Sequence, residues 1–336
     1  MLEMDLLSHT LRHAGERISP KSWTLSDGTR VTLHDVGILS FEPAKPGPGD
    51  IVLSAGVHGN ETAPQELLNG LVTGLINGAL RCQNRLLVLF GNPLAMAEGV
   101  REVEANMNRM FSGGHRQYLS TASAEAERAA LLENSVEAFF TQRQGSRYHY
   151  DLHTAIRASK RERFAIYPFR HGKPWRRAQL AFLANGGVDT VLLSHDPTHT
   201  LSYFSSDRFG ADAFTVELGK VRPFGQNDLE RLAPFRDQLI ALIEDSSPNL
   251  SEPETLTVFD VAQVIIKETE DFRLHFADDA ANFTPYPRGT LLASDGVAAH
   301  RVKAEEEAIV FPNAKVANGQ RACLTVVPVG ADQPFE

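Results

Sequence analysis

The chain has 336 residues, of which 42% are hydrophobic and 22% charged, enough for one large domain followed by a smaller one. The net charge of −9 gives no overall attraction to a phosphate backbone, so we expect no nucleic-acid partner, although a local group of Arg could bind a small anion. With two cysteines, no apolar leader and no run near the roughly 18 apolar residues of a membrane span, we expect a cytoplasmic protein without disulfides or a membrane anchor. No pattern indicates an oligomeric state.

Strand-like and helix-like patterns alternate as far as residue 250. A predicted hairpin at 31–41 is followed by apolar runs that predict strands at 51–55, 86–90, 148–152, 164–167, 190–193 and 213–218. Apolar residues at helical spacing predict helices at 62–75, 122–144, 175–184 and 229–243, the first with Thr62 as its N-cap. Strands that alternate with helices predict an α/β fold with a mixed, mostly parallel sheet and helices on both faces.

The character of the sequence changes near residue 250. The stretch 246–253 is rich in Ser, Pro and Asn and is a candidate linker. Beyond it, short β-prone runs at 255–266, 289–293, 308–311 and 322–327 are separated by Gly, Asn, Asp and Pro. We therefore expect a first domain at residues 1–250 and a small β-rich domain at residues 251–336.

Two imidazoles and one carboxylate stand where predicted strands end. His58 and Glu61 directly follow the run 51–55, and His153 ends the run that begins at residue 148. Open α/β sheets bind ligands at the carboxyl ends of their strands, and this donor set holds a catalytic zinc while leaving one position for water. The same His-x-x-Glu spacing at His13 follows no strand, so we interpret that copy as a chance repeat in a solvated segment. The sequence therefore predicts a hydrolytic zinc site.

Two further carboxylates are candidates for a role at this site. Glu217 lies in an otherwise apolar strand, where an unpaired charge is costly, so we expect it to take a proton from water and return it to the leaving group. The alternative is a structural ion pair with Lys220 or Arg222. Asp151 shares a strand face with His153 and is placed to accept a proton from a ligand imidazole. The alternative for Asp151 is a helix cap or a surface carboxylate.

A charged segment, residues 101–111, separates the predicted strand 86–90 from the predicted helix 122–144. It contains Arg101, Asn108 and Arg109. The planar fork of Arg suits a carboxylate, and an adjacent Asn amide can add a donor. On ordinary surface statistics alone, the segment would be a solvated charged loop. Beside the metal motif, it predicts a site for a small anionic substrate.

The order and spacing of four segments resembles the zinc-carboxypeptidase-like aspartoacylase and succinylglutamate desuccinylase family. These segments are His58-Gly59-Asn60-Glu61, Asn108-Arg109, Asp151-Leu152-His153 and Val216-Glu217-Leu218-Gly219. The stretches 162–168, 198–205 and 217–226 are similar to the desuccinylase branch in particular. The resemblance spans essentially the whole chain, including its β-rich end.

The resemblance implies a metal centre together with its base. One zinc ion per chain would be held by His58, Glu61 and His153. Glu217 would act as general base and then as general acid, and Arg101 would polarise the scissile carbonyl. The fold would be that of zinc carboxypeptidases, with residues 1–250 as the catalytic domain and residues 251–336 capping its cleft.

The resemblance also implies how a substrate is held. Asn108 and Arg109 would bind a substrate carboxylate. Arg208 lies near the position of a further carboxylate-binding Arg in the aspartoacylase branch. That branch also uses a Tyr from its C-terminal domain, and the corresponding neighbourhood here has Phe311 instead.

The implied reaction is zinc-dependent hydrolysis of N-succinyl-L-glutamate to succinate and L-glutamate, the last step of the arginine succinyltransferase route. One alternative is an aspartoacylase or a carboxypeptidase-type hydrolase that acts on another small anionic acyl-amino acid. The other is a catalytically silent binding module on the same fold. Metal content and hydrolysis of acylated amino acids distinguish the three.

Overall fold

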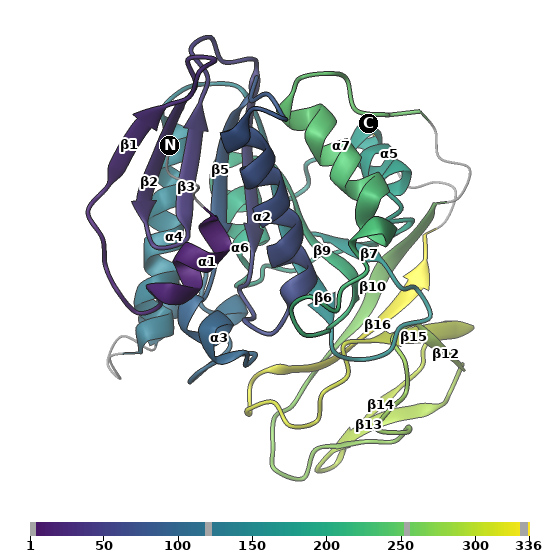
Figure 1. Ribbon diagram of the computed structural model, residues 1–336. Coiled ribbons are helices and arrows are strands. Elements are labelled where there is room, and N and C mark those ends of the chain that lie inside the picture. The colour runs from purple at the N-terminus through teal and green to yellow at the C-terminus, as the bar shows by residue number, and fades with distance from the viewer. Residues whose placement is uncertain (1–4, 118–122, 252–255, 330–334) are drawn as a thin grey trace.

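A large β-sheet with helices on both faces dominates the computed structural model, which describes residues 5–117, 123–251, 256–329 and 335–336 (Figure 1). The helices are α1 Leu6–Arg12, α2 Thr62–Asn77, α3 Pro93–Glu98, α4 Ala124–Thr141, α5 Arg177–Asn185, α6 Leu201–Phe209 and α7 Ala233–Ile243, with 3-10 turns η1 Met107–Arg109, η2 Gly114–Gln117 and η4 Leu229–Leu232. The strands are β1 Lys21–Thr24, β2 Arg30–Asp35, β3 Ile38–Glu42, β4 Gly49–Ala55, β5 Arg85–Phe90, β6 Ser146–Ala155, β7 Phe164–Tyr167, β8 Thr190–Leu193, β9 Asp212–Lys220, β10 Thr257–Ile266, β11 Arg273–Leu274, β12 Thr284–Pro287, β13 Leu291–Asp295, β14 Ala298–Arg301, β15 Glu306–Val310 and β16 Arg321–Pro328.

The main sheet has 13 strands in the order β1-β2-β3-β5-β4-β6-β9-β7-β8-β10-β16-β15-β12. Parallel pairing is concentrated at its centre, where β5, β4, β6 and β9 are successive neighbours. Hairpins extend both edges, so the sheet has seven antiparallel pairs and five parallel pairs. The predicted mixed sheet is confirmed, but the expectation that it is mostly parallel is wrong, because the antiparallel pairs added at both edges outnumber the parallel pairs.

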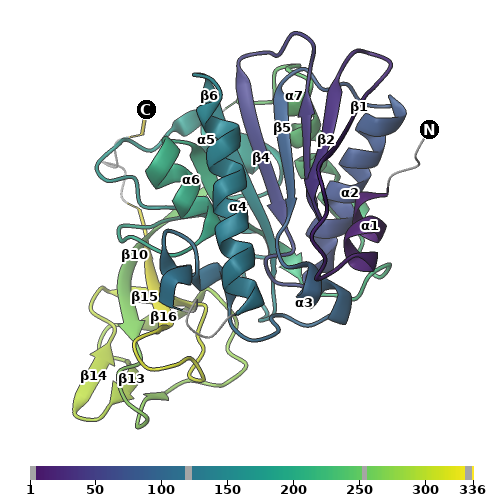
Figure 2. The same cartoon turned by 90° about the vertical axis from the view of Figure 1, so that its left-hand side faces the viewer.

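Helices pack on both faces of the centre, as Figures 1 and 2 show together. Helices α1, α2, α5 and α7 share one apolar core with one face. Helices α4 and α6 share a second core with the other face. Strands β4 and β5 are buried at every position, which is why their sequences are apolar runs rather than alternating patterns. Among the helices of the described ranges, none has the length and apolar character of a bilayer-spanning segment.

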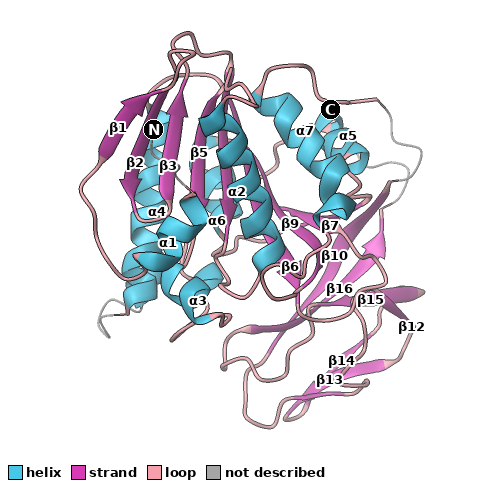
Figure 3. Ribbon diagram, in the orientation of Figure 1, coloured by secondary structure: helices cyan, strands magenta, loops and turns pink. Residues whose placement is uncertain are grey.

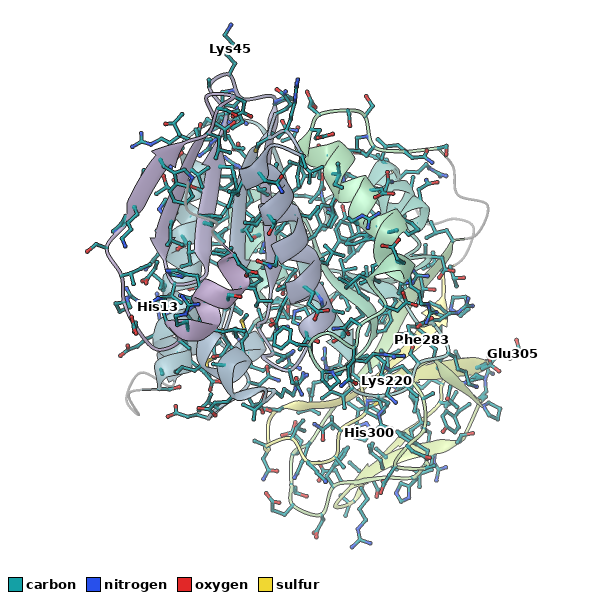
Figure 4. All side chains as sticks on the ribbon, in the orientation of Figure 1. His13, Lys45, Lys220, Phe283, His300 and Glu305 are labelled. Atoms are coloured by element: carbon teal, nitrogen blue, oxygen red, sulfur yellow. The ribbon has the colours of Figure 1, made fainter. Side chains whose placement is uncertain are left out.

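The C-terminal part of the chain extends the main sheet. Strand β10 runs parallel to β8, from Thr257 opposite Thr190 to Asp260 opposite Leu193. A second sheet of three strands, β11-β13-β14, lies beyond it, and the described residues after α7 are strands and loops (Figure 3). Phe283 lies where the two parts meet (Figure 4), in a cluster that contains residues of both β7 and β10. The predicted β-rich character is confirmed, and the boundary at residue 250 stays a prediction.

Candidate metal centre

The sheet topology brings the three predicted ligands together. Strands β4 and β6 are parallel neighbours, so the loop after β4 and the end of β6 meet at one edge of the sheet. His58 lies in that loop, Glu61 directly precedes α2, and His153 is near the end of β6. One ligand atom of each residue lies within 4.8 Å of the others, and all three residues are buried. In the copy at His13, the imidazole pairs with Glu16 at the surface and lies against the ring of His9.

Both imidazoles present Nδ1 to the carboxylate of Glu61. Nδ1 of His58 is 2.9 Å from Oε1, and Nδ1 of His153 is 3.1 Å from Oε2. Nε2 of His58 donates to Oδ1 of Asn106 at 3.1 Å, and Nε2 of His153 donates to Oδ2 of Asp151 at 3.0 Å. Nδ1 of His58 is buried without a hydrogen-bond partner among the described residues. Because each Nε2–H is engaged, the Nδ1 lone pairs and Glu61 form a donor set that fits a divalent metal ion.

The charged groups of the cluster shift one another's pKa values. Burial would raise the pKa of Glu61, but the imidazoles of His58 and His153 lower it well below its ordinary value. Burial would lower the pKa of His153, but the carboxylates of Asp151 and Glu61 raise it well above its ordinary value. Burial lowers the pKa of His58. The carboxylates of Asp151 and Glu61 thus favour a proton on His153, and a bound metal ion competes with that proton.

A buried chain of polar groups supports Asp151. Its Oδ1 accepts from Oγ of Ser54 at 2.6 Å. Ser54 is 2.9 Å from Nε2 of His149, whose Nδ1 is 2.6 Å from Oγ of Ser205. Burial lowers the pKa of His149 to about 4. Because the hydroxyl of Ser54 donates to Asp151, Nε2 of the neutral His149 ring donates to Ser54, and its Nδ1 accepts from Ser205. Asp151 is 0% exposed, so the alternative of a surface carboxylate is wrong.

Glu217 lies beside the ligands on the neighbouring strand. It is opposite His153 in the parallel β6–β9 pair, so both side chains project from the same face. The residue is buried, and its Oε2 has no hydrogen-bond partner within the described ranges. Burial, and next the negative charge of Glu61, raise the pKa of Glu217 to about 7. Lys220 is exposed at the end of β9, and neither it nor Arg222 forms an ion pair with Glu217 in the described part of the chain.

Arg101 reaches the ligands from the segment after α3. Its Nη1 is 2.8 Å from Oε1 of Glu61, and about a third of its side chain is exposed. Its carbonyl oxygen accepts from the N–H of Gly59 at 3.0 Å. This bond holds the segment against the ligand loop, the loop after β4 that contains His58. Arg101 thus places a positive charge at the partly open side of the cluster.

Asn108 and Arg109 belong to the turn that also holds His58. The N–H of Asn108 donates to Oδ1 of Asn106 at 3.0 Å, the same oxygen that accepts from His58. Nη1 of Arg109 donates to the carbonyl of Asn108 at 2.9 Å. Asn108 is 5% exposed, so the alternative of a solvated loop is wrong for it. This turn is anchored in the apolar core that α4 and α6 share by the buried side chains of Met107, Met110 and Phe111.

Comparison with known proteins identifies the family. Residues 48–243 match the succinylglutamate desuccinylase/aspartoacylase catalytic domain, and residues 254–329 match the AstE/AspA barrel-sandwich hybrid domain. The chain belongs to the succinylglutamate desuccinylase/aspartoacylase family.

Its relatives in this family cover nearly its full length. A curated succinylglutamate desuccinylase from Idiomarina loihiensis is 50% identical over 97% of this chain and 96% of its own. One from Shewanella baltica is 46% identical over 98% of this chain and 97% of its own. The crystal structure of the succinylglutamate desuccinylase from Chromobacterium violaceum has a TM-score of 0.85 at 39% identity and covers 98% of both chains.

Arg208 is the predicted site residue that the structure leaves apart. Helix α6 begins beside the site, where the N–H of Leu201 donates to Oδ1 of Asn108 at 3.4 Å. It ends near the start of β6, where Nη1 of Arg147 donates to the carbonyl of Phe209 at 2.9 Å. Arg208 is exposed in the last turn of α6, at the sheet edge remote from the metal ligands. The structure therefore does not support the substrate contact expected from the aspartoacylase branch.

Two residues of this family site were missing from the predicted set. Asn106 holds the imidazole of His58, and Ser54 holds the carboxylate of Asp151. Ser54 could have been found, because it precedes the ligand loop by a few residues on a strand that is otherwise apolar. Asn106 lies in a loop without periodicity, and no local pattern distinguishes it from other polar loop residues.

Proposed function

We propose that this chain is a zinc-dependent amide hydrolase that converts N-succinyl-L-glutamate and water to succinate and L-glutamate. One observation carries the proposal: the buried cluster of His58, Glu61 and His153 has Glu217 directly beside it. Full-length similarity to relatives named succinylglutamate desuccinylase supports this choice of substrate.

His58, Glu61 and His153 would hold the zinc ion. Two imidazole nitrogens and a carboxylate are the ligand types that catalytic zinc sites use, and such sites keep one position for water. When bound, zinc polarises a carbonyl oxygen and lowers the pKa of a water molecule to near ~7. Asn106 and Asp151 orient the two rings, so the protein contributes geometry as well as ligands.

Glu217 would move the proton through the reaction. It accepts a proton from the attacking water while the hydroxide oxygen bonds to the amide carbon. The same proton then passes to the amide nitrogen as the carbon–nitrogen bond breaks, which releases succinate and glutamate. A buried carboxylate with an unpartnered oxygen suits both transfers, because no protein donor competes for that oxygen within the described ranges.

Basic residues beside the cluster would bind the charged substrate. Arg101 stabilises the oxygen that becomes negative when the amide carbon is attacked. Asn108 and Arg109 bind a substrate carboxylate through amide and guanidinium donors. We further propose that residues 1–250 carry out the chemistry and that residues 251–336 cap the site. Arg157, just beyond β6, donates to the carbonyls of Ala280 and Pro312 and so ties the second part to the first.

The test is metal content together with a substrate panel. We expect the purified chain to carry zinc, to lose activity on chelation, and to release amine from N-succinyl-L-glutamate faster than from N-acetyl-L-aspartate, N-acetyl-L-glutamate or a peptide. Activity on N-acetyl-L-aspartate or the peptide alone would assign the chain to a different acyl-amino acid. A zinc-loaded chain that hydrolyses none of them would contradict the enzymatic proposal.

A further inference from the structure

Arg321 is a cation whose side chain is partly buried. It opens β16, far in sequence from the residues of the proposed site. Its Nε is buried and has no hydrogen-bond partner among the described residues, and no carboxylate of those residues forms an ion pair with it. Burial, and next the charge of Arg109, lower the pKa of Arg321 to about 9. A desolvated guanidinium that forms no ion pair with a carboxylate of the described residues is suited to an anionic group of a ligand.

Two links connect Arg321 with the site. One is electrostatic, because the charge of Arg109 contributes to lowering the pKa of Arg321. The other runs through aromatic rings: the guanidinium carbon is 5.5 Å from the ring centre of Phe311, which is 5.6 Å from that of Phe164. Phe164 is directly opposite Glu217 in the β7–β9 pair, and residues opposite one another project from the same face. Arg321 therefore lies on the side of the sheet where Glu217 acts.

The chain around Phe311 is held in a costly conformation. Phe311 has a φ of 53°, in the left-handed region that bulky residues rarely adopt and that persists only where the surroundings enforce it. Its N–H donates to Oδ1 of the buried Asn282 at 2.8 Å. Arg157 fixes the same junction by donating to the carbonyl of Pro312 at 3.1 Å. These contacts fix Phe311, and with it the ring against which the guanidinium of Arg321 lies.

We propose that Arg321 is a specificity-determining residue that binds the side-chain carboxylate of the leaving glutamate, beside an α-carboxylate bound at Arg109. This inference rests on the proposed function. Glutamate carries two carboxylates a few bonds apart, and two guanidiniums from different parts of the chain match this pair of charges. A substrate without the side-chain carboxylate would offer no anion to Arg321, so Arg321 favours a dicarboxylic amino acid.

Substrates that lack a single carboxylate test the assignment. In N-succinyl-L-norvaline a methyl group replaces the glutamate side-chain carboxylate, and in N-butanoyl-L-glutamate a methyl group replaces the acyl carboxylate. We expect Arg321→Met to lower kcat/KM about 10²–10³-fold on both glutamate substrates, mainly by raising KM, and to leave the norvaline substrate nearly unchanged. Arg321→Lys keeps the charge without the fork and should lose less. Arg273→Met, at an exposed position on β11, is the matched control and should behave as wild type.

Each other outcome has a defined meaning. An equal loss on all three substrates, with a lower melting temperature, would make Arg321 structural and overturn the assignment. A loss on the norvaline substrate but not on N-butanoyl-L-glutamate would place Arg321 at the acyl carboxylate and also overturn it. If the wild type hydrolyses none of them, the proposed function fails, and calorimetry of L-glutamate and L-norvaline binding decides about Arg321. Only the binding of L-glutamate should then weaken in Arg321→Met, and unchanged binding would contradict the proposal.

Discussion

At the scale of single residues, the burial that suits Glu217 to proton transfer also lowers the stability of the folded chain when this side chain is ionised. Burial and the charge of Glu61 raise its pKa from 4.5 to about 7. A carboxyl with a higher pKa in the folded chain than in the unfolded chain binds its proton more tightly when folded. Its contribution to stability is therefore fully present below about pH 4.5 and is lost as the pH rises through about 7. Above that pH, the ionised side chain destabilises the metal-free protein.

Replacing Glu217 by Gln should therefore stabilise the chelator-treated protein at pH 8. We expect a gain of roughly 1–3 kcal/mol in the free energy of unfolding, because the buried charge is removed, and a much smaller gain at pH 5. Urea unfolding at both pH values measures the difference. Glu305→Gln is the control, because Glu305 projects from the surface (Figure 4). A gain that does not change with pH would contradict the assigned cause.

Asn106 and Asp151 act through the imidazoles that they orient. We expect Asn106→Ala and Asp151→Asn each to weaken zinc binding about 10–100-fold, because a freed ring must be ordered when the metal binds. Competition with a chromogenic chelator measures this affinity. Unchanged zinc affinity in both variants would show that the ring contacts have no such effect. The role of Asp151 was predictable, because the period of two in a strand places it on the same face as His153. The role of Asn106 was not predictable, because its loop has no regular period.

At the scale of elements, the ligand loop depends on close backbone approach. A Cβ on Gly59 would lie 2.1 Å from the carbonyl carbon of Ala95 in α3, so the loop cannot keep its place with a larger residue. Gly56 has a φ of 72°, which lets the chain turn as it leaves β4. The loop can therefore bring His58 and Glu61 to the same site only because glycines occupy positions 56 and 59.

Two glycine substitutions distinguish the effect of close packing at Gly59 from the general effect of replacing glycine by alanine. Gly59→Ala should destabilise the fold by about 1–3 kcal/mol and weaken zinc binding, because the loop must move away from α3. Gly70→Ala, at an exposed position inside α2 with nothing within 4 Å of a new Cβ, should instead stabilise by about 0.5–1 kcal/mol. Denaturant unfolding of the two variants measures both values. Equal effects would contradict the role of close packing.

Elements were predictable from sequence where burial determines the pattern. The apolar runs 164–167 and 190–193 coincide with β7 and β8. The N-cap of α2 was not predictable in the same way: Thr62 was expected as the N-cap, but Glu61 occupies that place and makes no side-chain cap bond. Its carboxylate faces His58 and His153 instead, so the chemistry of the site overrides a local rule. The direction of α6, which carries Arg208 away, also depends on packing that the sequence does not display.

At the scale of the whole molecule, one sheet joins the two parts. The parallel pairing of β10 with β8 connects strands separated by more than 60 residues, and local patterns contain no signal for such a pair. Phe164 and Phe259, from the two parts, also pack in one core. We therefore expect the metal-free chain to unfold in a single calorimetric transition, with equal calorimetric and van't Hoff enthalpies. Two resolved transitions would contradict this and would favour an independent C-terminal domain.

The most direct test of the central claim is the rate at which a zinc-loaded Glu217→Gln variant releases glutamate from N-succinyl-L-glutamate. His58, Glu61 and His153 are unchanged in this variant, so it should bind zinc as the wild type does. We expect its turnover to fall about 10²–10⁴-fold, because the group that carries the proton from water to nitrogen is lost. Near wild-type turnover in a variant with full zinc content would contradict the assignment of Glu217.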